Sequence, residues 1–392
     1  MQEAYIVAAL RTAGGRRGGR LSGWHPADLA ARVIDALLDA TGADPAAVED
    51  VIMGCVSQVG EQSSNIARNA VLASRLPESV PATSIDRQCG SSQQALHFAA
   101  QAVMSGCMDC VIAAGVESMS RVPMGSPGGL AARAGMGSYL SPLMRRRYPQ
   151  GEFSQFTGAE MMADKYQLSR ERLDAYALRS HVLAAAAHQA GRFAAEIVPL
   201  GPGADLGAAN PEVHGIDEGI RFDASLAAIR GVKPLVDGGR ISAAHASQIC
   251  DGASGVMVVN ARGLQALGRP PLARVHHMAV LGHDPVIMLE APIPATRNAL
   301  RKSGLRLADI DLYEVNEAFA SVPLAWLDAL QADPERLNVN GGAIALGHPL
   351  GASGTRLTAT LVHALQQRQA RYGLQTMCEG GGMANVTILE RL

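Results

Sequence analysis

The sequence of 392 residues has few aromatic side chains, little charge and few cysteines. Aromatic residues make up 4% of the chain, charged residues make up 18%, and the formal net charge at pH 7 is −2. This near-balance removes the electrostatic argument for binding nucleic acid or an anionic membrane surface. No apolar run approaches the roughly 18–20 residues that a membrane-spanning helix needs. Hydrophobic residues reach 48%, which excludes a disordered chain and indicates a compact protein with a sizeable core.

Six cysteines are too few for a disulfide scaffold in a chain of this length. Glu3 stands where a signal peptide has a cation, and the apolar run after it is short, so we interpret residues 1–10 as a buried strand. Both observations favour a reduced, cytoplasmic protein. Cys107 and Cys110 form a lone C-x-x-C pair without two further ligands at suitable spacing, so we expect no metal site, and a redox dithiol or simple packing stays open.

Helical and extended patterns alternate at both ends of the chain. Leu29, Val33 and Leu37 recur every four residues, and Gly42 is placed to end their helix. No acid, lysine or arginine occurs between Arg87 and Asp109, so the helix expected there is a buried, central one. The patterns predict helices at 26–40, 91–105, 295–304 and 353–366, and strands at 48–54, 82–85, 111–114, 310–315 and 374–377.

The order of these elements predicts an internal duplication. Cys55 corresponds to Asn316 at an offset of 261 residues, and Gly115 corresponds to Gly380 at an offset of 265 residues. Two similar offsets favour a repeated α/β unit. The residues between the two halves, from 119 to about 250, fit neither half, and we interpret them as an insertion that covers one end of the sheets. Ligands usually bind at such covers. We therefore expect three parts: 1–118 with about 251–270, an inserted domain at 119–250, and 271–392.

Cys89 is the first candidate for chemistry. It lies between a predicted strand and the N-terminus of the buried helix, where free N–H groups stabilise a thiolate and lower the thiol pKa from about 8.5. Gly90 lets a ligand carbonyl approach the backbone closely. The alternative is a buried structural cysteine.

Three further candidates lie in the C-terminal third. His348 is held between Gly347 and Pro349 in a glycine-rich turn, Cys378 heads a run of three glycines after a strand, and Asn316 follows another strand. Glycines after a strand expose N–H groups that can hold an oxyanion. The alternatives are a solvent-facing histidine, a plain glycine turn and a helix cap. The histidines at 276, 277 and 283 are expected in a surface loop without acid partners.

Taken together, these motifs resemble the thiolase family. They are Cys89-Gly-Ser, Asn316-Glu-Ala-Phe, Gly-His348-Pro and Cys378-x-Gly, in that order along the chain. The resemblance covers essentially residues 1–392, is poorest at 119–156, and is strongest to bacterial degradative thiolases, including those of steroid catabolism. It implies the α/β thiolase fold: two duplicated βαβαβαββ halves in five layers (α-β-α-β-α), with an inserted loop domain.

The resemblance also implies a role for each motif. Cys89 is the nucleophile that takes the acyl group as a thioester, and His348 is the base that deprotonates it. Cys378 protonates the departing acetyl-CoA carbanion, or removes its α-proton in the synthetic direction. Asn316, through a bound water, stabilises the thioester enolate together with His348, and the N–H groups of Cys89 and Gly380 form a second oxyanion hole. No metal or redox cofactor is implied, and coenzyme A is a substrate.

The same resemblance implies the residues that hold coenzyme A and the acyl group. They are Arg221, Ser225, Ser247, Met288, Ala318 and Phe319. The run Arg145–Arg147 is either a phosphate contact or a solvated face. The expected partners are acyl-CoA, coenzyme A and further copies of the chain, as a homodimer or as two dimers paired through their loop domains.

The sequence departs from the family pattern at three places. His245 stands where thiolases commonly have asparagine, and Ser92 replaces a commoner glycine. Residues 155–160 lack the Met-Gly pair of short-chain thiolases, which argues against acetoacetyl-CoA as the preferred substrate.

The main interpretation is a degradative thiolase that cleaves a 3-oxoacyl-CoA with coenzyme A, releasing acetyl-CoA and a shortened acyl-CoA. The first alternative is a biosynthetic acetyl-CoA acetyltransferase. Cys378 argues against a decarboxylating ketoacyl synthase, which has His or Asn there, and against a Cys/His hydrolase, which does not need it. An inactive CoA- or lipid-binding relative would lack the nucleophile or the base, and both are present.

Overall fold

The strands of the chain form one continuous hydrogen-bonded network, built from two similar halves. The computed structural model describes residues 2–151, 153–201 and 213–392. In order across the network, the strands of the first half are β4 (Ala82–Ile85), β3 (Asp50–Gly54), β5 (Cys110–Ser118), β7 (Cys250–Val259) and β1 (Tyr5–Thr12). Those of the second half are β8 (Ala273–Gly282), β11 (Met383–Arg391), β10 (Tyr372–Glu379) and β9 (Leu312–Val315).

The two halves repeat the same strand directions. β3 runs parallel to β5, and β9 runs parallel to β10. β5, β7 and β1 then continue antiparallel, as do β10, β11 and β8. The halves join where Tyr5 and Ile6 of β1 pair with β8. The predicted duplication and α/β fold class are therefore confirmed.

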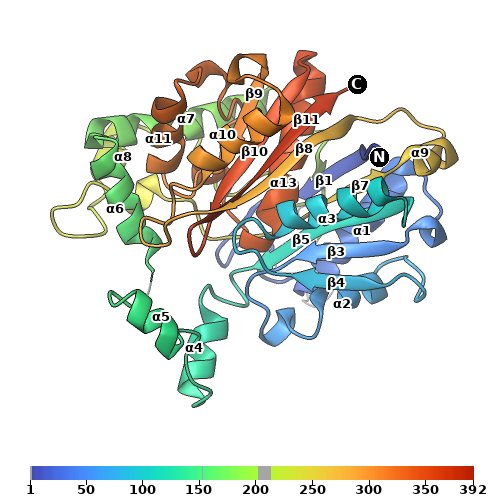
Figure 1. Ribbon diagram of the computed structural model, residues 1–392, viewed down its shortest axis with the longest axis horizontal. Helices are drawn as coiled ribbons and strands as arrows, with labels where there is room; N and C mark the ends of the chain where they lie inside the picture. The colour runs from blue at the N-terminus through green and yellow to red at the C-terminus, as the bar shows by residue number, and fades with distance from the viewer. Residues whose placement is uncertain (1, 152, 202–212) are drawn as a thin grey trace.

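Helices form the remaining three of the five layers (Figure 1). α3 (Ser91–Ser105) and α13 (Ser353–Arg368) pack against each other and lie between the two halves of the strand network. The first half is covered outside by α1 (Pro26–Thr41) and α2 (Ile66–Ala73), and the second by α10 (Pro292–Ser303) and α11 (Ser321–Leu330). α9 (Ala261–Leu267) leads from β7 towards β8.

The central layer explains why α3 carries no charge. Its apolar residues, among them Leu96 and Val103, share one core with Leu361 and Leu365 of α13, and all four are fully buried. At the N-terminal ends the two helices approach so closely that a Cβ at Gly354 would overlap the backbone of Gln93. Glycine at this position therefore sets how closely the two halves of the molecule meet.

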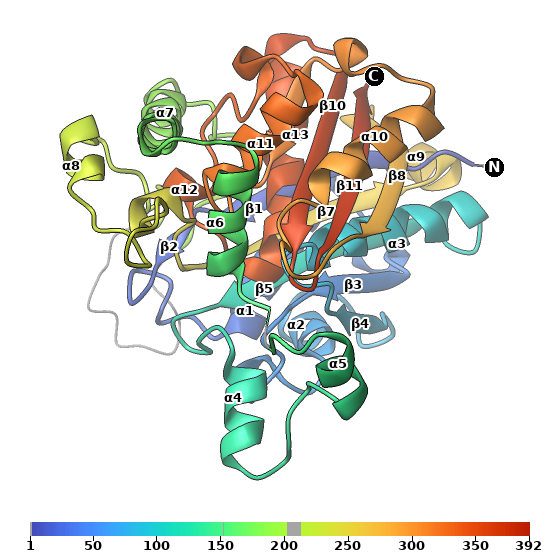
Figure 2. The same cartoon turned by 60° about the vertical axis from the view of Figure 1, so that its left-hand side comes forward.

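The inserted segment carries α4 (Ser126–Arg133), α5 (Pro142–Arg147), α6 (Gln155–Lys165), α7 (Arg170–Gln189) and α8 (Leu226–Arg230). α6 packs on α11, and α7 packs on the short α12 (Ala343–Leu346). Figures 1 and 2 both show α4 and α5 projecting away from the rest of the protein. Two short strands, β2 (Gly15–Arg16) and β6 (Ile197–Val198), pair with β7 and β1.

One sequence-based expectation about secondary structure is wrong. His276 and His277 lie in β8 and His283 just after it, and two of these histidines have acid partners. His276 Nδ1 is 3.7 Å from Glu390, and His283 Nε2 is 3.0 Å from Glu290. Within the described part of the chain, no helix is both long enough and apolar enough to span a membrane.

Candidate active site

The four motif residues lie where strands end and the two central helices begin. Cys89 follows β4 and directly precedes the N-cap of α3, while Cys378 is the penultimate residue of β10. Asn316 follows β9, and its backbone N–H donates to Thr376 O of β10 at 3.0 Å. His348 lies in the turn between α12 and α13. Cys378 and Asn316 therefore lie at the ends of neighbouring parallel strands, and Cys89 and His348 lie just before the two central helices, which is a usual location for sites in α/β proteins.

Cys89, Cys378 and Gly380 form one group. Burial and then the carboxyl of Glu379 raise the pKa of the Cys89 thiol to about 12, although the N–H groups of Cys89 and Gly380 lower it. Burial and then Cys89 raise the pKa of Cys378 well above its ordinary value. The lowering of the Cys89 pKa expected from its helix position does not occur, because loss of water outweighs the two N–H groups. Both cysteines are neutral thiols at rest.

His348 and Asn316 form the second group. Asn316 Nδ2 lies 3.3 Å from His348 Nε2, and His348 Nδ1 lies 2.5 Å from Ser353 Oγ. The single hydroxyl proton of Ser353 goes to Pro349 O at 2.8 Å, so the Nδ1–H of His348 donates to Ser353. Nε2 then carries a free electron pair, which accepts from Asn316. Burial, followed by the nearby charge of Arg356, lowers the pKa of His348 to about 3, so the ring is neutral.

The loop that carries Asn316 is fixed by its neighbour Glu317. This buried carboxylate accepts hydrogen bonds from Tyr176 (2.9 Å), Ser180 (2.6 Å) and the backbone N–H of Ile344 (3.0 Å). Tyr176 and Ser180 belong to α7, and Ile344 belongs to α12, which precedes the His348 turn. Glu317 therefore ties the Asn316 loop to the inserted domain and to the histidine turn.

The residues expected to bind coenzyme A divide into buried and exposed groups. Ala318, Phe319 and Met288 are buried, and Met288 has a backbone φ of +55°. Ser247 is partly buried, and its N–H donates to Ala318 O at 3.0 Å. Arg221 and Ser225 are exposed on the inserted domain, where Ser225 caps the N-terminus of α8. The structure thus connects Ser247 to the Asn316 loop and leaves the other two on the surface.

Two departures from the family pattern have clear contacts. Ser92 Oγ accepts the N–H of Thr355 at 3.0 Å, which links the first turns of α3 and α13. His245 is fully buried, its Nδ1 accepts the N–H of Ser242 at 3.1 Å, and its Nε2 therefore donates to Asp174 at 2.7 Å. In the third departure, Phe156 stacks edge-on against Phe319, with ring centroids 5.7 Å apart.

Sequence reasoning missed three residues around the site. Ser353 fixes the tautomer of His348, and Glu117 accepts N–H groups from Val56 and Gly351 at 2.9 Å each. Glu379 lies buried beside Cys89. Its position between Cys378 and Gly380 was the one available signal in the sequence. Strand alternation predicts that its side chain points away from the face of Cys378, so sequence reasoning did not include it in the site.

Neither a metal site nor a disulfide is found among the described residues. No group of three or more potential ligands converges there, and all six cysteines have free thiols. Cys107 is exposed and Cys110 is buried in β5.

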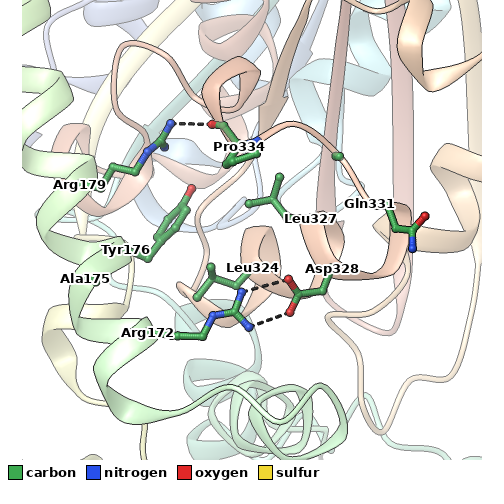
Figure 3. A pocket seen from close by; sticks show the side chains of 10 residues that line it. Arg172, Ala175, Tyr176, Arg179, Leu324, Leu327, Asp328, Gln331 and Pro334 are labelled. Carbon is green, nitrogen blue, oxygen red and sulfur yellow. Dashed lines mark hydrogen bonds and ion pairs between the residues drawn. The ribbon is translucent and has the colours of Figure 1, made fainter.

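A cavity of about 650 Å³ lies between α7 and α11, outside the motif residues (Figure 3). Arg172 forms a bidentate ion pair with Asp328 across it, and Arg179 donates to Pro334 O at 2.8 Å. Both arginines are already engaged, and neither Cys89, Cys378, Asn316 nor His348 lines the cavity. It is therefore not the site of the cysteine chemistry.

Comparisons with known proteins agree with this geometry. Residues 4–262 match the family model of the thiolase N-terminal domain, and residues 269–391 match that of the thiolase C-terminal domain. The steroid 3-ketoacyl-CoA thiolase FadA6 of Mycobacterium tuberculosis is 51% identical over 398 residues, covering 100% of this chain and 95% of that protein. A 3-ketoacyl-CoA thiolase of Citrobacter koseri is 40% identical over 399 residues, with full coverage of both. The crystal structure of human mitochondrial 3-ketoacyl-CoA thiolase superposes with a TM-score of 0.88 at 34% identity, covering 100% and 99% of the two chains.

Proposed function

The chain belongs to the thiolase family, and from this premise we propose that it is a degradative 3-oxoacyl-CoA thiolase that works through an acylated Cys89. It is an acyltransferase that cleaves the 3-oxoacyl thioester with coenzyme A and releases acetyl-CoA and an acyl-CoA shortened by two carbons. The observation that carries this proposal is the pairing of Cys89 with Cys378, two thiols with raised pKa values, beside the N–H groups of Cys89 and Gly380. A neutral His348, hydrogen-bonded to Asn316, supports it further.

The first step suits the protonation states of Cys89 and His348. Since the thiol is neutral at rest, it needs a base at the moment of attack. The electron pair on His348 Nε2, which accepts from Asn316 in the resting structure, supplies one. The sulfur attacks the 3-oxo carbon, and the oxyanion that forms there is held by the N–H groups of Cys89 and Gly380. A single donor of this kind is worth about 3–4 kcal/mol in other enzymes.

The second step requires an acid at the departing carbon. Cys378 keeps its proton because burial raises its pKa, so it is available to protonate the acetyl-CoA enolate as the carbon–carbon bond breaks. Once His348 Nε2 has taken the Cys89 proton, it donates to the enolate oxygen, and Asn316, whose Nδ2 lies 3.3 Å from Nε2, stabilises the same oxygen through a water. The thiol of coenzyme A then gives its proton to Cys378 and takes the acyl group from Cys89. His348 returns its proton to the Cys89 sulfur, which restores the resting enzyme.

Large or ring-bearing acyl groups, such as those from steroid degradation, are the proposed substrates. The 51% identity to a steroid 3-ketoacyl-CoA thiolase supports this choice. Phe156, stacked on Phe319 where short-chain thiolases have a Met-Gly pair, also supports it. Met288 and Ser247 lie beside the pantetheine, Ser225 lines the coenzyme A channel, and Arg221 holds the nucleotide end of coenzyme A.

The proposal also covers the setting of the enzyme. Six free thiols support a reducing compartment, the cytoplasm. The exposed side chains of Met136, Tyr139 and Leu143, which lie between α4 and α5 or in α5, support a homo-oligomer, either a dimer or a dimer of dimers. In this proposal the chain has three parts: residues 1–118 with about 251–270, the inserted domain at 119–250, and residues 271–392.

The test is consumption of 3-oxoacyl-CoA and formation of acetyl-CoA over a panel of substrates, from acetoacetyl-CoA to ring-bearing acyl chains, with and without coenzyme A. We expect CoA-dependent turnover that is highest on the bulky substrates and absent in Cys89→Ala. A preference for acetoacetyl-CoA would replace the degradative assignment by the biosynthetic one. No turnover by a folded protein that binds coenzyme A would overturn the enzymatic proposal.

A further inference from the structure

Glu379 is a buried carboxyl that the proposed mechanism does not use. Its side chain is 1% exposed, and it stands between Cys378 and Gly380 in the sequence. Among the described residues, neither carboxyl oxygen has a hydrogen-bond partner, although the backbone N–H of Asn385 lies close enough to favour the anion somewhat. An ionised carboxylate without donors is costly in a protein interior.

A second acceptor without a donor lies beside it. Asn385 Nδ2 donates to Gly90 O at 3.1 Å, which fixes the orientation of the amide, and its Oδ1 is buried without a partner. Glu379 pairs with Met383 across β10 and β11, so the side chains of Glu379 and Asn385 lie on the same face of the sheet. A Cβ at Gly90 would overlap Glu379 Oε1 and would lie 2.8 Å from Asn385 Nδ2.

These contacts leave two side chains with bare acceptor oxygens against one glycine, and a proton on the Glu379 carboxyl supplies the missing donor. The charged and titratable groups that face Glu379 are Arg87, which favours the anion, and Asp86, which opposes it, together with the thiols of Cys89 and Cys378. Burial is the largest effect and raises the pKa of Glu379 to about 8.

We propose that Glu379 is a positioning residue that works as a neutral carboxylic acid, donating its proton to Asn385 Oδ1 and so holding Gly90 and the Cys89 turn, and that its ionisation switches the reaction off. The consequence for turnover rests on the thiolase function proposed above, whereas the consequence for Cys89 reactivity does not. When Glu379 ionises, its negative charge lies close to Cys89 and opposes both the thiolate and the oxyanion at the N–H groups of Cys89 and Gly380.

The first test needs no substrate: the rate at which iodoacetamide alkylates Cys89, followed by mass spectrometry from pH 6.5 to 9.5. At pH values far below the pKa of a thiol, its alkylation rate rises about tenfold per pH unit, because only the thiolate reacts. We expect this rise to flatten above about pH 8 in the parent protein and to continue unbroken in Glu379→Gln, whose amide keeps a donor for Asn385. Identical profiles in the two proteins would overturn the proposal.

The second test is the pH dependence of kcat for thiolysis. A single ionisation near pH 8 reduces kcat at pH 9 to about a tenth of its plateau value. We expect Glu379→Gln to keep kcat at pH 7 within threefold and to lose the alkaline decline. Glu379→Ile should lose the decline as well, but with kcat at least tenfold lower, since Asn385 Oδ1 then has no donor.

The matched control is Glu314→Gln. Glu314 is a second buried carboxyl with a raised pKa, in β9, and the charged groups that affect it are Glu317, Glu196 and Arg356. We expect the alkaline decline to persist in this variant. A decline that persists in Glu379→Gln, or that disappears in Glu314→Gln, would assign it to another group. If no variant turns over substrate, the alkylation profiles still decide whether Glu379 controls Cys89.

Discussion

Replacing Ser353 by alanine tests how the base is held. The Ser353 hydroxyl accepts the Nδ1–H of His348 at 2.5 Å, and its own proton goes to Pro349 O, which leaves Nε2 unprotonated and able to receive the Cys89 proton. When the ring takes that proton, the bond to Ser353 becomes charge-assisted, and a bond of this kind contributes about 1.5–3 kcal/mol. In Ser353→Ala this contribution is lost, and the His348 tautomer with its proton on Nε2 becomes accessible.

We expect Ser353→Ala to lower kcat for thiolysis by about 10- to 150-fold, because each 1.36 kcal/mol changes a rate tenfold. KM should change little, since the lost bond strengthens as the reaction proceeds and Ser353 holds no part of the substrate in our proposal. The assay is the initial rate of acetyl-CoA formation as a function of 3-oxoacyl-CoA concentration, with thermal unfolding as a check on folding.

Ser321→Ala is the matched control for this prediction. Ser321 Oγ is buried without a partner at the start of α11, so its removal deletes a buried hydroxyl without touching His348. We expect kcat to stay within twofold of the parent. Equal losses in both variants, or no loss in Ser353→Ala, would refute the assigned tautomer.

Three further predictions concern stability and packing. Arg11→Met leaves the buried carboxylates of Glu196 and Asp217, which lie 2.6 and 2.7 Å from the guanidinium, without their partner. The free energy of unfolding measured in urea should fall by about 3–5 kcal/mol, and a loss under 1 kcal/mol would contradict the pairing. Burial lowers the pKa values of His97 and His348 to about 3, below the unfolded value of about 6.5. The contribution of each neutral ring to the free energy of unfolding is therefore complete above pH 6.5, and it falls by about 1.4 kcal/mol per pH unit below that. The urea midpoint should be lower at pH 5 than at pH 7, and the difference should be smaller in His97→Gln. Gly90→Ala forces a methyl group into a buried carboxyl, which should lower the melting temperature and kcat, whereas Gly215→Ala, with open space around it, should change neither.

Much of the fold could be predicted because the decisive signals are local. The helix at 91–105 and the strand at 82–85 agree with α3 and β4 at both ends, because Gly106 adopts a left-handed conformation that ends the helix and the strand is bounded by turns. The duplication was visible because equivalent residues keep nearly constant offsets. The pairing of β1 with β8 was not, because a register between strands over 260 residues apart leaves no local pattern.

The strand at β8 shows where local reasoning failed. His276 and His277 interrupt the apolar alternation of β8, so the segment resembled a loop. Their environment comes from β11, which pairs along the whole of β8 and brings Glu390 close to His276. Partners distant in the chain decide such segments, and a single sequence does not contain them.

The site could be predicted as a set of residues but not as a set of protonation states. The motifs around Cys89 and His348 are recognisable in sequence, and a helix N-terminus by itself indicates a lowered thiol pKa. The structure shows the opposite direction, because burial and Glu379 together outweigh the N–H groups. Desolvation depends on everything packed around the thiol, which sequence spacing does not reveal.

The most direct test of the central claim is to identify the residue that carries the acyl group. The protein is incubated briefly with a 3-oxoacyl-CoA, quenched in acid and digested, and each cysteine peptide is weighed by mass spectrometry. The account predicts the mass of the shortened acyl group on the Cys89 peptide alone, lost again on addition of coenzyme A and absent in Cys89→Ala. An acyl group on any other cysteine, with Cys89 unmodified, would contradict it.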